Sequence, residues 1–184
     1  MERASVVGES FGGVVALHAA LGHADRVDKL VLLSSLAKTE LTPAVWCKLK
    51  FLLPIVAALG RAFPGAAQSL FATLHASDVV EASEPDWVRA FFVKEASWAH
   101  HFSVVARIGI VANLNIESRV RFIEAPARLL YGADDTFTGA STDRLLALLP
   151  HAEKRALPGG HLPHVTSPRL FAELVGEFVG GAAG

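Results

Sequence analysis

The chain has 184 residues, of which 52% are hydrophobic and 19% are charged, so the composition excludes a disordered protein and suffices for one domain with a buried core. A net charge of −1 gives no indication of an electrostatic partner such as nucleic acid or an anionic membrane. The single cysteine, Cys47, excludes an intrachain disulfide and a cysteine-rich metal site.

The N-terminal residues do not look like a targeting segment. Residues 1–10 lack the basic stretch and apolar run that are typical of a signal peptide. The most apolar run, residues 51–60, contains Pro54 and is too short to span a bilayer. We therefore expect a cytoplasmic protein that acts on a small-molecule substrate, with no nucleic-acid or membrane partner.

The first 35 residues predict a strand, a helix and a second strand. The β-branched run at residues 4–8 predicts a strand that is buried on both faces. Small and apolar residues at helical spacing predict a helix over residues 11–22, with Gly22 as its C-cap. The apolar run at residues 29–35 predicts the second strand. This order indicates a βαβ unit, and therefore a parallel sheet with helices on its faces.

The pattern changes between residues 36 and 120. Strand-like runs give way to helical stretches that are rich in Ala, Leu, Phe and Trp and are broken by prolines. We predict that residues 36–120 form a helical cap or lid inserted into an α/β core made of residues 1–35 and 121–184. Within the second part of that core, the sequence predicts strands at residues 127–132 and 153–157 and helices at residues 141–150 and 169–179.

The strongest chemical signal is the sequence Gly-Glu-Ser-Phe-Gly-Gly at residues 8–13, between a predicted strand and a predicted helix. A Gly-x-Ser-x-Gly turn in this setting is typical of a nucleophile elbow, which presents the hydroxyl of Ser10 to a base. We expect glycine at Gly8 and Gly12 because a Cβ would collide across so tight a turn. The N–H of Phe11, at the start of the helix, is the expected donor to an oxyanion.

Two other interpretations of this segment are weaker. A bare match could be no more than the turn glycines of a βα unit, but the flanking strand and helix favour a nucleophile. A dinucleotide-binding turn needs Gly-x-Gly-x-x-Gly, and here Ser10 occupies the middle glycine position. The next strand also ends in Ser34 and Ser35, with no carboxylate to hold a ribose. We therefore expect no nucleotide, and no other cofactor.

A pair of aspartates directly follows the strand at residues 127–132. Carboxylates at this end of a parallel strand lie at the edge where open α/β sheets build their active sites. We predict that Asp135 fixes the tautomer of a catalytic histidine and stabilises its protonated form. Either aspartate could instead be an ordinary turn residue or helix cap, an interpretation that fits Asp134 better than Asp135.

Histidine is the side chain that best exchanges a proton near neutral pH, and one follows two glycines after the last predicted strand. We predict that this residue, His161, is the base that takes the serine proton. His164 is expected to be structural. The neighbouring His100 and His101 do not predict a metal site, because adjacent helical residues do not face each other.

The order Ser10, Asp135, His161 is the order of the α/β-hydrolase triad. In its motifs the chain resembles the α/β-hydrolase superfamily, in the branch of lipase-like and esterase-like enzymes with a helical cap. The resemblance lies in the stretches SVVGESFGG, DRVDKLVLLSS, RLLYGADD and PGGHLPH. It implies that these three residues are nucleophile, acid and base, that Phe11 donates to the oxyanion, and that the predicted cap shapes the substrate pocket.

The implied activity is hydrolysis of a small, apolar ester or related carbonyl substrate through an acyl-enzyme. Acyl transfer, perhydrolysis and carbon–carbon bond hydrolysis use the same triad and remain open, whereas Ser10 argues against dehalogenation. Aromatic residues of the predicted cap favour an apolar substrate, although packing between cap helices is the better interpretation for most of them. They are Trp46, Phe51, Trp87, Phe91, Phe92, Trp98 and Phe102.

The N-terminus departs from the resembling family, in which the nucleophile follows the fifth strand of the sheet rather than the first. The loop that supplies the second oxyanion N–H there has no counterpart in this sequence, and loss of one such donor lowers the rate by about a hundredfold to a thousandfold. The alternative hypothesis is therefore a non-catalytic truncated fragment, or a half-domain that requires a complementing N-terminal segment. Its first strand would be open to self-association.

Overall fold

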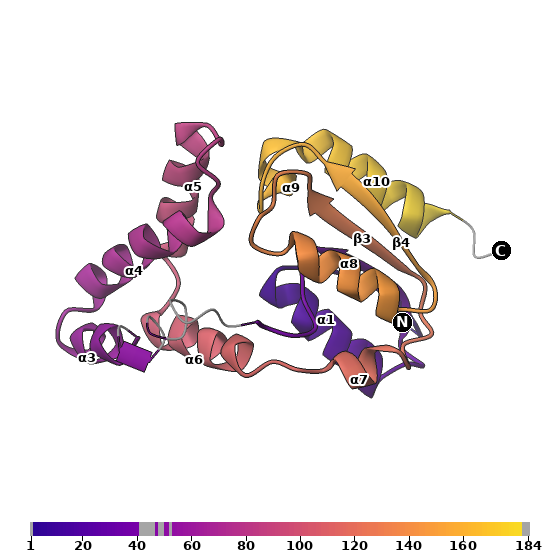
Figure 1. Ribbon diagram of the computed structural model, residues 1–184, viewed down its shortest axis with the longest axis horizontal. Helices are drawn as coiled ribbons and strands as arrows, with labels where there is room; N and C mark the ends of the chain where they lie inside the picture. The colour runs from indigo at the N-terminus through magenta and orange to yellow at the C-terminus, as the bar shows by residue number, and fades with distance from the viewer. Residues whose placement is uncertain (1, 41–46, 48–49, 52, 182–184) are drawn as a thin grey trace. The chain divides into compact units, whose positions relative to one another are not determined.

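The computed structural model describes residues 2–40, 47, 50–51 and 53–181 (Figure 1). The chain divides into two compact units. Met1–Ala37 and Asn115–Gly184 form the first, which contains the sheet and is called the sheet unit below. Lys38–Leu114 form the second, which is helical in its described part and is called the helical unit.

The sheet unit is built on four parallel strands in the order β1-β2-β3-β4. Each of the three pairings is parallel, so all strand C-termini lie at the same edge of the sheet. The predicted α/β class with a parallel sheet flanked by helices is confirmed. The strands are β1 (Ala4–Glu9), β2 (Val27–Leu33), β3 (Ala127–Gly132) and β4 (Ala152–Leu157).

Helices pack on both faces of this sheet (Figure 1). α1 packs on β1 and β2, α8 packs on β3 and β4, and the closing helix α10 packs on the opposite face. The helices of the sheet unit are α1 (Phe11–Gly22), α7 (Glu117–Val120), α8 (Gly139–Leu148), α9 (Pro163–Thr166) and α10 (Pro168–Gly180). α1 ends at Gly22, but its C-cap is His23 with a φ of −141°, so the predicted glycine cap is wrong.

The core under α10 follows from the alternation of side chains along each strand. Apolar residues of β2, β3 and β4 point to the same face and form a buried cluster, and full burial of one such side chain contributes roughly 1.5–3 kcal/mol. The cluster is Val31, Leu33, Leu130 and Leu157, packed against Phe171, Leu174, Val175 and Phe178 of α10.

Two buried cations in the first halves of β2 and β3 also hold α10. The ammonium of Lys29 donates to the carbonyls of Phe178 and Gly181 at 2.9 and 2.6 Å, and so caps the end of the helix. The guanidinium of Arg128 donates to the carbonyl of Leu174 at 2.6 Å and to Glu153 at 2.7 Å. The N–H groups of both cations are therefore hydrogen-bonded to acceptors within the protein, as buried charges require.

The strand β1 lies at one edge of the sheet and differs from its prediction. The cluster that α10 covers draws its strand residues from β2, β3 and β4, and Val7 of β1 is 47% exposed. The expectation that this strand is buried on both faces is therefore wrong. An apolar run predicts a strand, but the number of its covered faces depends on which neighbours pack on it.

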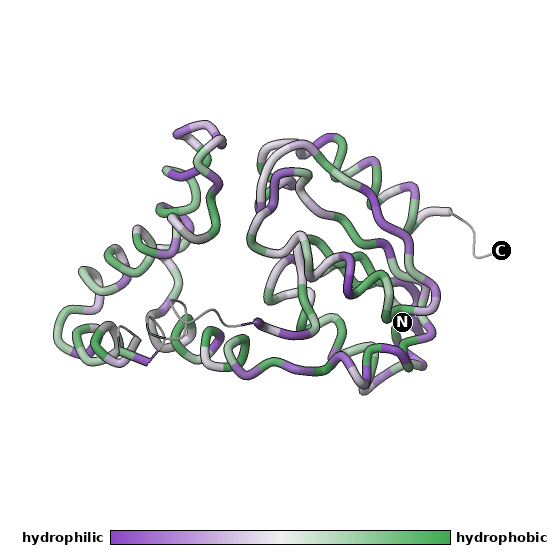
Figure 2. Tube along the Cα trace, in the orientation of Figure 1, coloured by the Kyte–Doolittle hydropathy of each residue, from purple (hydrophilic) through white to green (hydrophobic). Residues whose placement is uncertain are grey.

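The described part of the helical unit contains α3 (Leu53–Ala62), α4 (Pro64–Val79), α5 (Asp86–Ala96) and α6 (His101–Ala112). Pro64 is the first residue of α4, and Pro85 is the N-cap of α5, so these prolines begin helices. α4 packs against both α3 and α5, with alanines buried in its interface. Most helices of both units carry hydrophobic and hydrophilic residues together (Figure 2). Among the described residues, every helix is too short or too polar to cross a bilayer.

Candidate active site

Ser10 stands in the turn between β1 and α1, in a backbone conformation that is rare for a residue with a side chain. Its φ is 49°, in the left-handed region. Its N–H donates to the carbonyl of Leu33 at 2.9 Å, and its carbonyl accepts from Gly13 N–H and from the hydroxyl of Ser35, each at 3.0 Å. A strained conformation costs about 1–3 kcal/mol and persists only when its surroundings hold it. These three bonds, with a fourth from the N–H of Val14 to the Ser10 carbonyl at 3.4 Å, hold it here.

Of the two glycine collisions predicted for this turn, one is confirmed and one is wrong. A Cβ on Gly8 would collide with the backbone of Gly12, as expected. A Cβ on Gly12 itself would meet no atom of the described residues within 4 Å, so the predicted collision there is wrong. Instead, a Cβ on Gly13 would collide with the side chain of Ser35 on the loop after β2. A second tight approach therefore lies between α1 and the loop after β2, which the local motif does not reveal.

The structure brings Ser10, His161 and Asp135 together at the C-terminal edge of the sheet. Nε2 of His161 lies 3.2 Å from Oγ of Ser10, and Nδ1 lies 3.1 Å from Oδ2 of Asp135. Both distances are within hydrogen-bonding range. His161 is 2% exposed and Asp135 is 6% exposed, so water competes little for these bonds.

The carboxylate of Asp135 is fixed by the turn that it begins. Its Oδ1 accepts from the N–H groups of Phe137 and Thr138, each at 2.9 Å, and its Oδ2 accepts from the hydroxyl of Thr138 at 2.5 Å. Burial favours the neutral acid, but the hydrogen bonds and charge of His161 and the bonds from Thr138 outweigh it and lower the pKa of Asp135 well below its usual range. Thr138, three residues after the aspartate, was not predicted; an Asp-x-x-Thr spacing is its signal.

The loop after β4 carries His161 back to the end of β3. The N–H groups of Ala133 and Asp134 donate to the carbonyls of Leu157 and Gly159, at 2.8 and 3.0 Å. Gly159 has a φ of 101°, which favours glycine. A Cβ on Gly132 would collide with the carbonyls of this loop, so the two backbones approach as closely as glycine allows.

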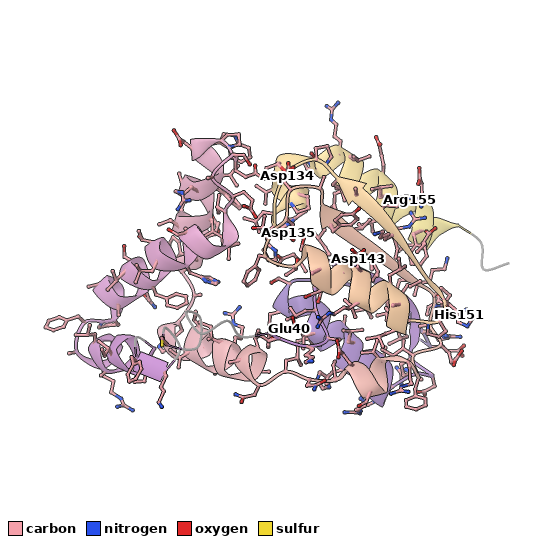
Figure 3. All side chains as sticks on the ribbon, in the orientation of Figure 1. Glu40, Asp134, Asp135, Asp143, His151 and Arg155 are labelled. Atoms are coloured by element: carbon pink, nitrogen blue, oxygen red, sulfur yellow. The ribbon has the colours of Figure 1, made fainter. Side chains whose placement is uncertain are left out.

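Asp134 and Asp135, although adjacent, are placed differently. Both lie near the end of β3, far from His151 at the opposite edge of the sheet (Figure 3). Asp134 is exposed, whereas Asp135 is buried against the histidine. This arrangement fits the turn interpretation of Asp134.

A sequence model described as the alpha/beta hydrolase family matches residues 2–174 of the chain, a range that includes all three of these residues. The chain belongs to this family.

Curated relatives of this α/β hydrolase match it along almost its whole length. It is 32% identical over 193 residues to the protein named "Putative carbamate hydrolase RutD" of Caulobacter sp. (strain K31), covering 100% of the chain and 68% of that protein. It is 26% identical over 180 residues to the pimeloyl-(acyl-carrier protein) methyl ester esterase of Chromobacterium violaceum, covering 95% of the chain and 69% of that esterase.

Solved structures agree on the fold of the α/β hydrolase. A hydrolase from Pseudomonas aeruginosa PA01 has a TM-score of 0.78 at 25% identity, covering 98% of this chain and 66% of the other. The esterase EaEST from Exiguobacterium antarcticum has the same TM-score at 13% identity, which shows the fold alone. The chain spans about two thirds of the length of the relatives it matches.

Phe11 is the first residue of α1 in this α/β hydrolase. The first N–H groups of a helix have no carbonyl partner within that helix, so they are free to bind an anion. The N–H of Phe11 also follows directly on the nucleophile candidate in the chain. Its role as the oxyanion donor stays a prediction.

The remaining histidines of interest lie apart from this chemistry. His164 lies in α9, and its ring centroid is 6.0 Å from that of Phe171. Burial and the charge of His161 lower the pKa of His164. Within the described ranges, no three His, Cys, Asp or Glu side chains are grouped so that they could hold a metal ion.

The aromatic residues of the helical unit are more exposed than helix packing would make them. Phe51, Trp87, Phe91 and Trp98 are 41–78% exposed, so packing between helices does not account for them. Phe92 packs on His75, with ring centroids 5.8 Å apart. Trp46 lies outside the described residues, and so does the side chain of Phe102.

Proposed function

We propose that this α/β hydrolase cleaves a small, apolar ester or related carbonyl compound through an acyl-enzyme on Ser10. The observation that carries the proposal is the hydrogen-bonded series from Ser10 through His161 to Asp135, with distances of 3.2 and 3.1 Å. A serine hydroxyl is a weak nucleophile, and it becomes a strong one when an oriented imidazole takes its proton.

The chemistry follows from the atoms that face one another. The carboxylate of Asp135 accepts a hydrogen bond from the Nδ1–H of His161, which leaves the lone pair of Nε2 directed at the hydroxyl of Ser10. As Oγ attacks the carbonyl carbon, Nε2 takes the hydroxyl proton, and the N–H of Phe11 stabilises the oxyanion that forms. The same proton then passes from Nε2 to the leaving alcohol.

Deacylation repeats these steps with water. Nε2 of His161 takes a proton from a water molecule as its oxygen attacks the acyl carbon. Collapse of the second tetrahedral intermediate releases the acid and returns the proton to Oγ of Ser10. Ester and water are consumed, acid and alcohol are formed, and the enzyme is unchanged.

The substrate class is proposed from two observations. The names of two relatives refer to a carbamate and to a methyl ester, and both compounds have a carbonyl carbon bonded to oxygen. The exposed rings of the helical unit, Trp87 and Trp98 among them, favour an apolar acyl or aromatic group. We propose that residues 36–120 serve as the cap that selects this substrate.

Phosphonate labelling tests the proposal. The folded chain is incubated with a fluorophosphonate probe and with a short-chain p-nitrophenyl ester, and the modified peptide is located by mass spectrometry. We expect labelling at Ser10 that is lost in Ser10→Ala and retained in Ser83→Ala, an exposed serine of the helical unit. Absence of labelling in a folded wild-type sample would contradict the proposal.

A second candidate function is a half-domain that becomes active only with a complementing polypeptide. Among the described residues β1 is an edge strand and Val7 is 47% exposed, which favours this candidate because such an edge accepts a further strand. Co-expression with the N-terminal third of the Caulobacter relative separates the two candidates. Labelling of Ser10 that appears only after co-expression supports the half-domain, and equal labelling in both samples supports an enzyme that is active alone.

A further inference from the structure

Glu9 occupies the position between the strand and the candidate nucleophile. It is the last residue of β1 and is paired in register with Leu33 of β2. Its Oε1 lies 3.8 Å from Nε2 of His161, the same nitrogen that is 3.2 Å from Oγ of Ser10. The imidazole therefore has Asp135 at one nitrogen and Glu9 beside the other.

The titratable groups around this imidazole come from three different segments of the sheet unit. Asp135 follows β3, Glu9 ends β1, and His164 lies three residues beyond His161. Burial raises the pKa of the Glu9 carboxyl, the positive charge of His161 opposes that rise, and the charge of Asp135 adds to it. Among the described residues, charge interactions thus link Glu9 with His161 and Asp135, and link His161 with His164.

We propose that Glu9 is a positioning residue of the proposed hydrolase, whose carboxylate stabilises protonated His161 and thereby sets the pH at which Ser10 becomes reactive. The proposal rests on the function proposed above. It assigns a role to the first variable position of the Gly-x-Ser-x-Gly turn, a position to which sequence reasoning gave none.

The distance decides how Glu9 acts. At 3.8 Å the carboxylate attracts the charged imidazole, but it is too far to form a hydrogen bond. The proton that Nε2 takes from Ser10 is therefore not captured by Glu9, and it stays available for the leaving group. Glu9 contributes charge, while Ser10 and Asp135 provide the hydrogen bonds.

The direction in which the pH–rate profile shifts when the Glu9 charge is removed follows from the protonation state of His161 that the reaction needs. His161 accepts the proton of Ser10 only when it is neutral, and a neighbouring carboxylate favours its protonated form. Removal of the Glu9 charge should therefore move the acid limb of the rate profile to lower pH. Since the Glu9 side chain is 37% exposed, water screens its charge, and we expect a shift of about 0.5–1 pH unit.

The same substitution should slow the reaction where His161 is already neutral. In the transition state His161 becomes positive, and the loss of one nearby carboxylate removes part of its stabilisation. We expect the plateau rate to fall by about twofold to tenfold, since one pKa unit corresponds to a tenfold change. A variant that merely distorted the turn would lower the plateau and leave the midpoint where it was.

The first test is the pH profile of phosphonate labelling at Ser10. The second-order rate is measured between pH 5 and 9 for the wild type, Glu9→Gln and Glu9→Asp, with Glu173→Gln on the exposed surface of α10 as the matched control. We expect a lower midpoint for Glu9→Gln, an intermediate one for Glu9→Asp, and no change for Glu173→Gln. Equal midpoints for all four proteins would overturn the proposal.

A second measurement keeps the inference testable if no labelling occurs. In the Ser10→Ala background, the ring signals of His161 are followed by NMR across the same pH range, with and without Glu9→Gln. A midpoint that falls with Glu9→Gln supports the proposal even if the proposed hydrolysis fails, and an unchanged midpoint overturns it. Circular dichroism establishes that each variant is folded, and Glu9→Asp replaces Glu9→Gln if the latter does not fold.

Discussion

The two edges of the sheet both bury charged side chains, but the charges are used differently. In the first halves of β2 and β3, Lys29 and Arg128 bind carbonyls and a carboxylate that belong to the packed structure. At the C-terminal edge, Asp135 binds His161, and the second nitrogen of His161 faces a hydroxyl in a strained turn. Burial of charge alone therefore does not identify an active site. What identifies the active site is a buried charged group whose hydrogen-bond partner, here the hydroxyl of Ser10, is still able to react.

The C-terminal edge of the sheet, which carries the candidate catalytic residues, is called the reactive edge below. The largest effect expected there is on turnover. Asp135→Asn keeps the shape of the side chain but no longer stabilises protonated His161, and we expect the rate of ester hydrolysis to fall by about a hundredfold to ten-thousandfold. Asp134→Asn is the matched control, because its side chain is exposed one residue away. Comparable losses in both variants would mean that the turn, and not the Asp135 bond, is what matters.

At the opposite edge the expected effect is on stability. Arg128→Met removes the donor to Leu174 and Glu153, and leaves acceptors in a poorly hydrated place. We expect the free energy of unfolding in urea to fall by roughly 1–3 kcal/mol, with labelling of Ser10 unchanged at low denaturant. Arg169→Met, on the exposed surface of α10, should stay within about 0.5 kcal/mol of the wild type. A labelling defect in folded Arg128→Met would break the division between the two edges.

Substitution of the two glycines that follow Phe11 tests how closely α1 approaches the loop after β2. Gly13→Ala forces a Cβ against the side chain of Ser35, which is 2% exposed and has little space to move. We expect a loss of roughly 1–3 kcal/mol in the free energy of unfolding. Gly12→Ala meets open space and should cost no more than about 0.5 kcal/mol, or even stabilise α1. If Gly12→Ala were the more damaging variant, the packing described for α1 would be incorrect.

Acid should weaken the reactive edge in a way that depends on Asp135. The folded state lowers the pKa of this carboxyl, so the ionised form stabilises the fold above about pH 4, the range of an unfolded aspartate. That contribution is lost as the pH falls below this value. Urea unfolding between pH 7 and pH 3 should show a steeper decline for the wild type than for Asp135→Asn. Parallel declines would assign the acid sensitivity to other carboxylates.

The placement of the three candidate catalytic residues could be predicted because each follows a strand, and parallel strands end at the same edge. Chain order then restricts which of them can meet. The contacts of Ser35, Thr138 and Glu9 could not be predicted in this way, because they depend on which loops approach one another. Thr138 had a local signal in its spacing from Asp135, whereas Ser35 meets Gly13 only through the packing of α1 on β2.

The errors about the burial of β1 and about the role of Gly12 have one physical origin. An apolar run indicates that a strand has been formed, but it contains no information on how many layers cover it. Val7 has the same β-branched side chain as Val31, its partner in the register, yet Val7 is 47% exposed and Val31 is 0% exposed. Position in the sheet, and not residue type, makes the difference. Gly12 is similar, because its neighbour Gly13 makes the close approach that the motif suggested for Gly12.

The bond from the Ser10 amide to the carbonyl of Leu33 joins the elbow to the second strand. If β1 separates from β2, this bond is lost and the backbone of Ser10 can relax to an ordinary conformation. The hydroxyl of Ser10 then turns away from the imidazole of His161. The rate at which a phosphonate reacts with Ser10 thus reports on the local separation of β1 from the sheet. The probe should stop reacting at a denaturant concentration below the one at which helical circular dichroism is lost.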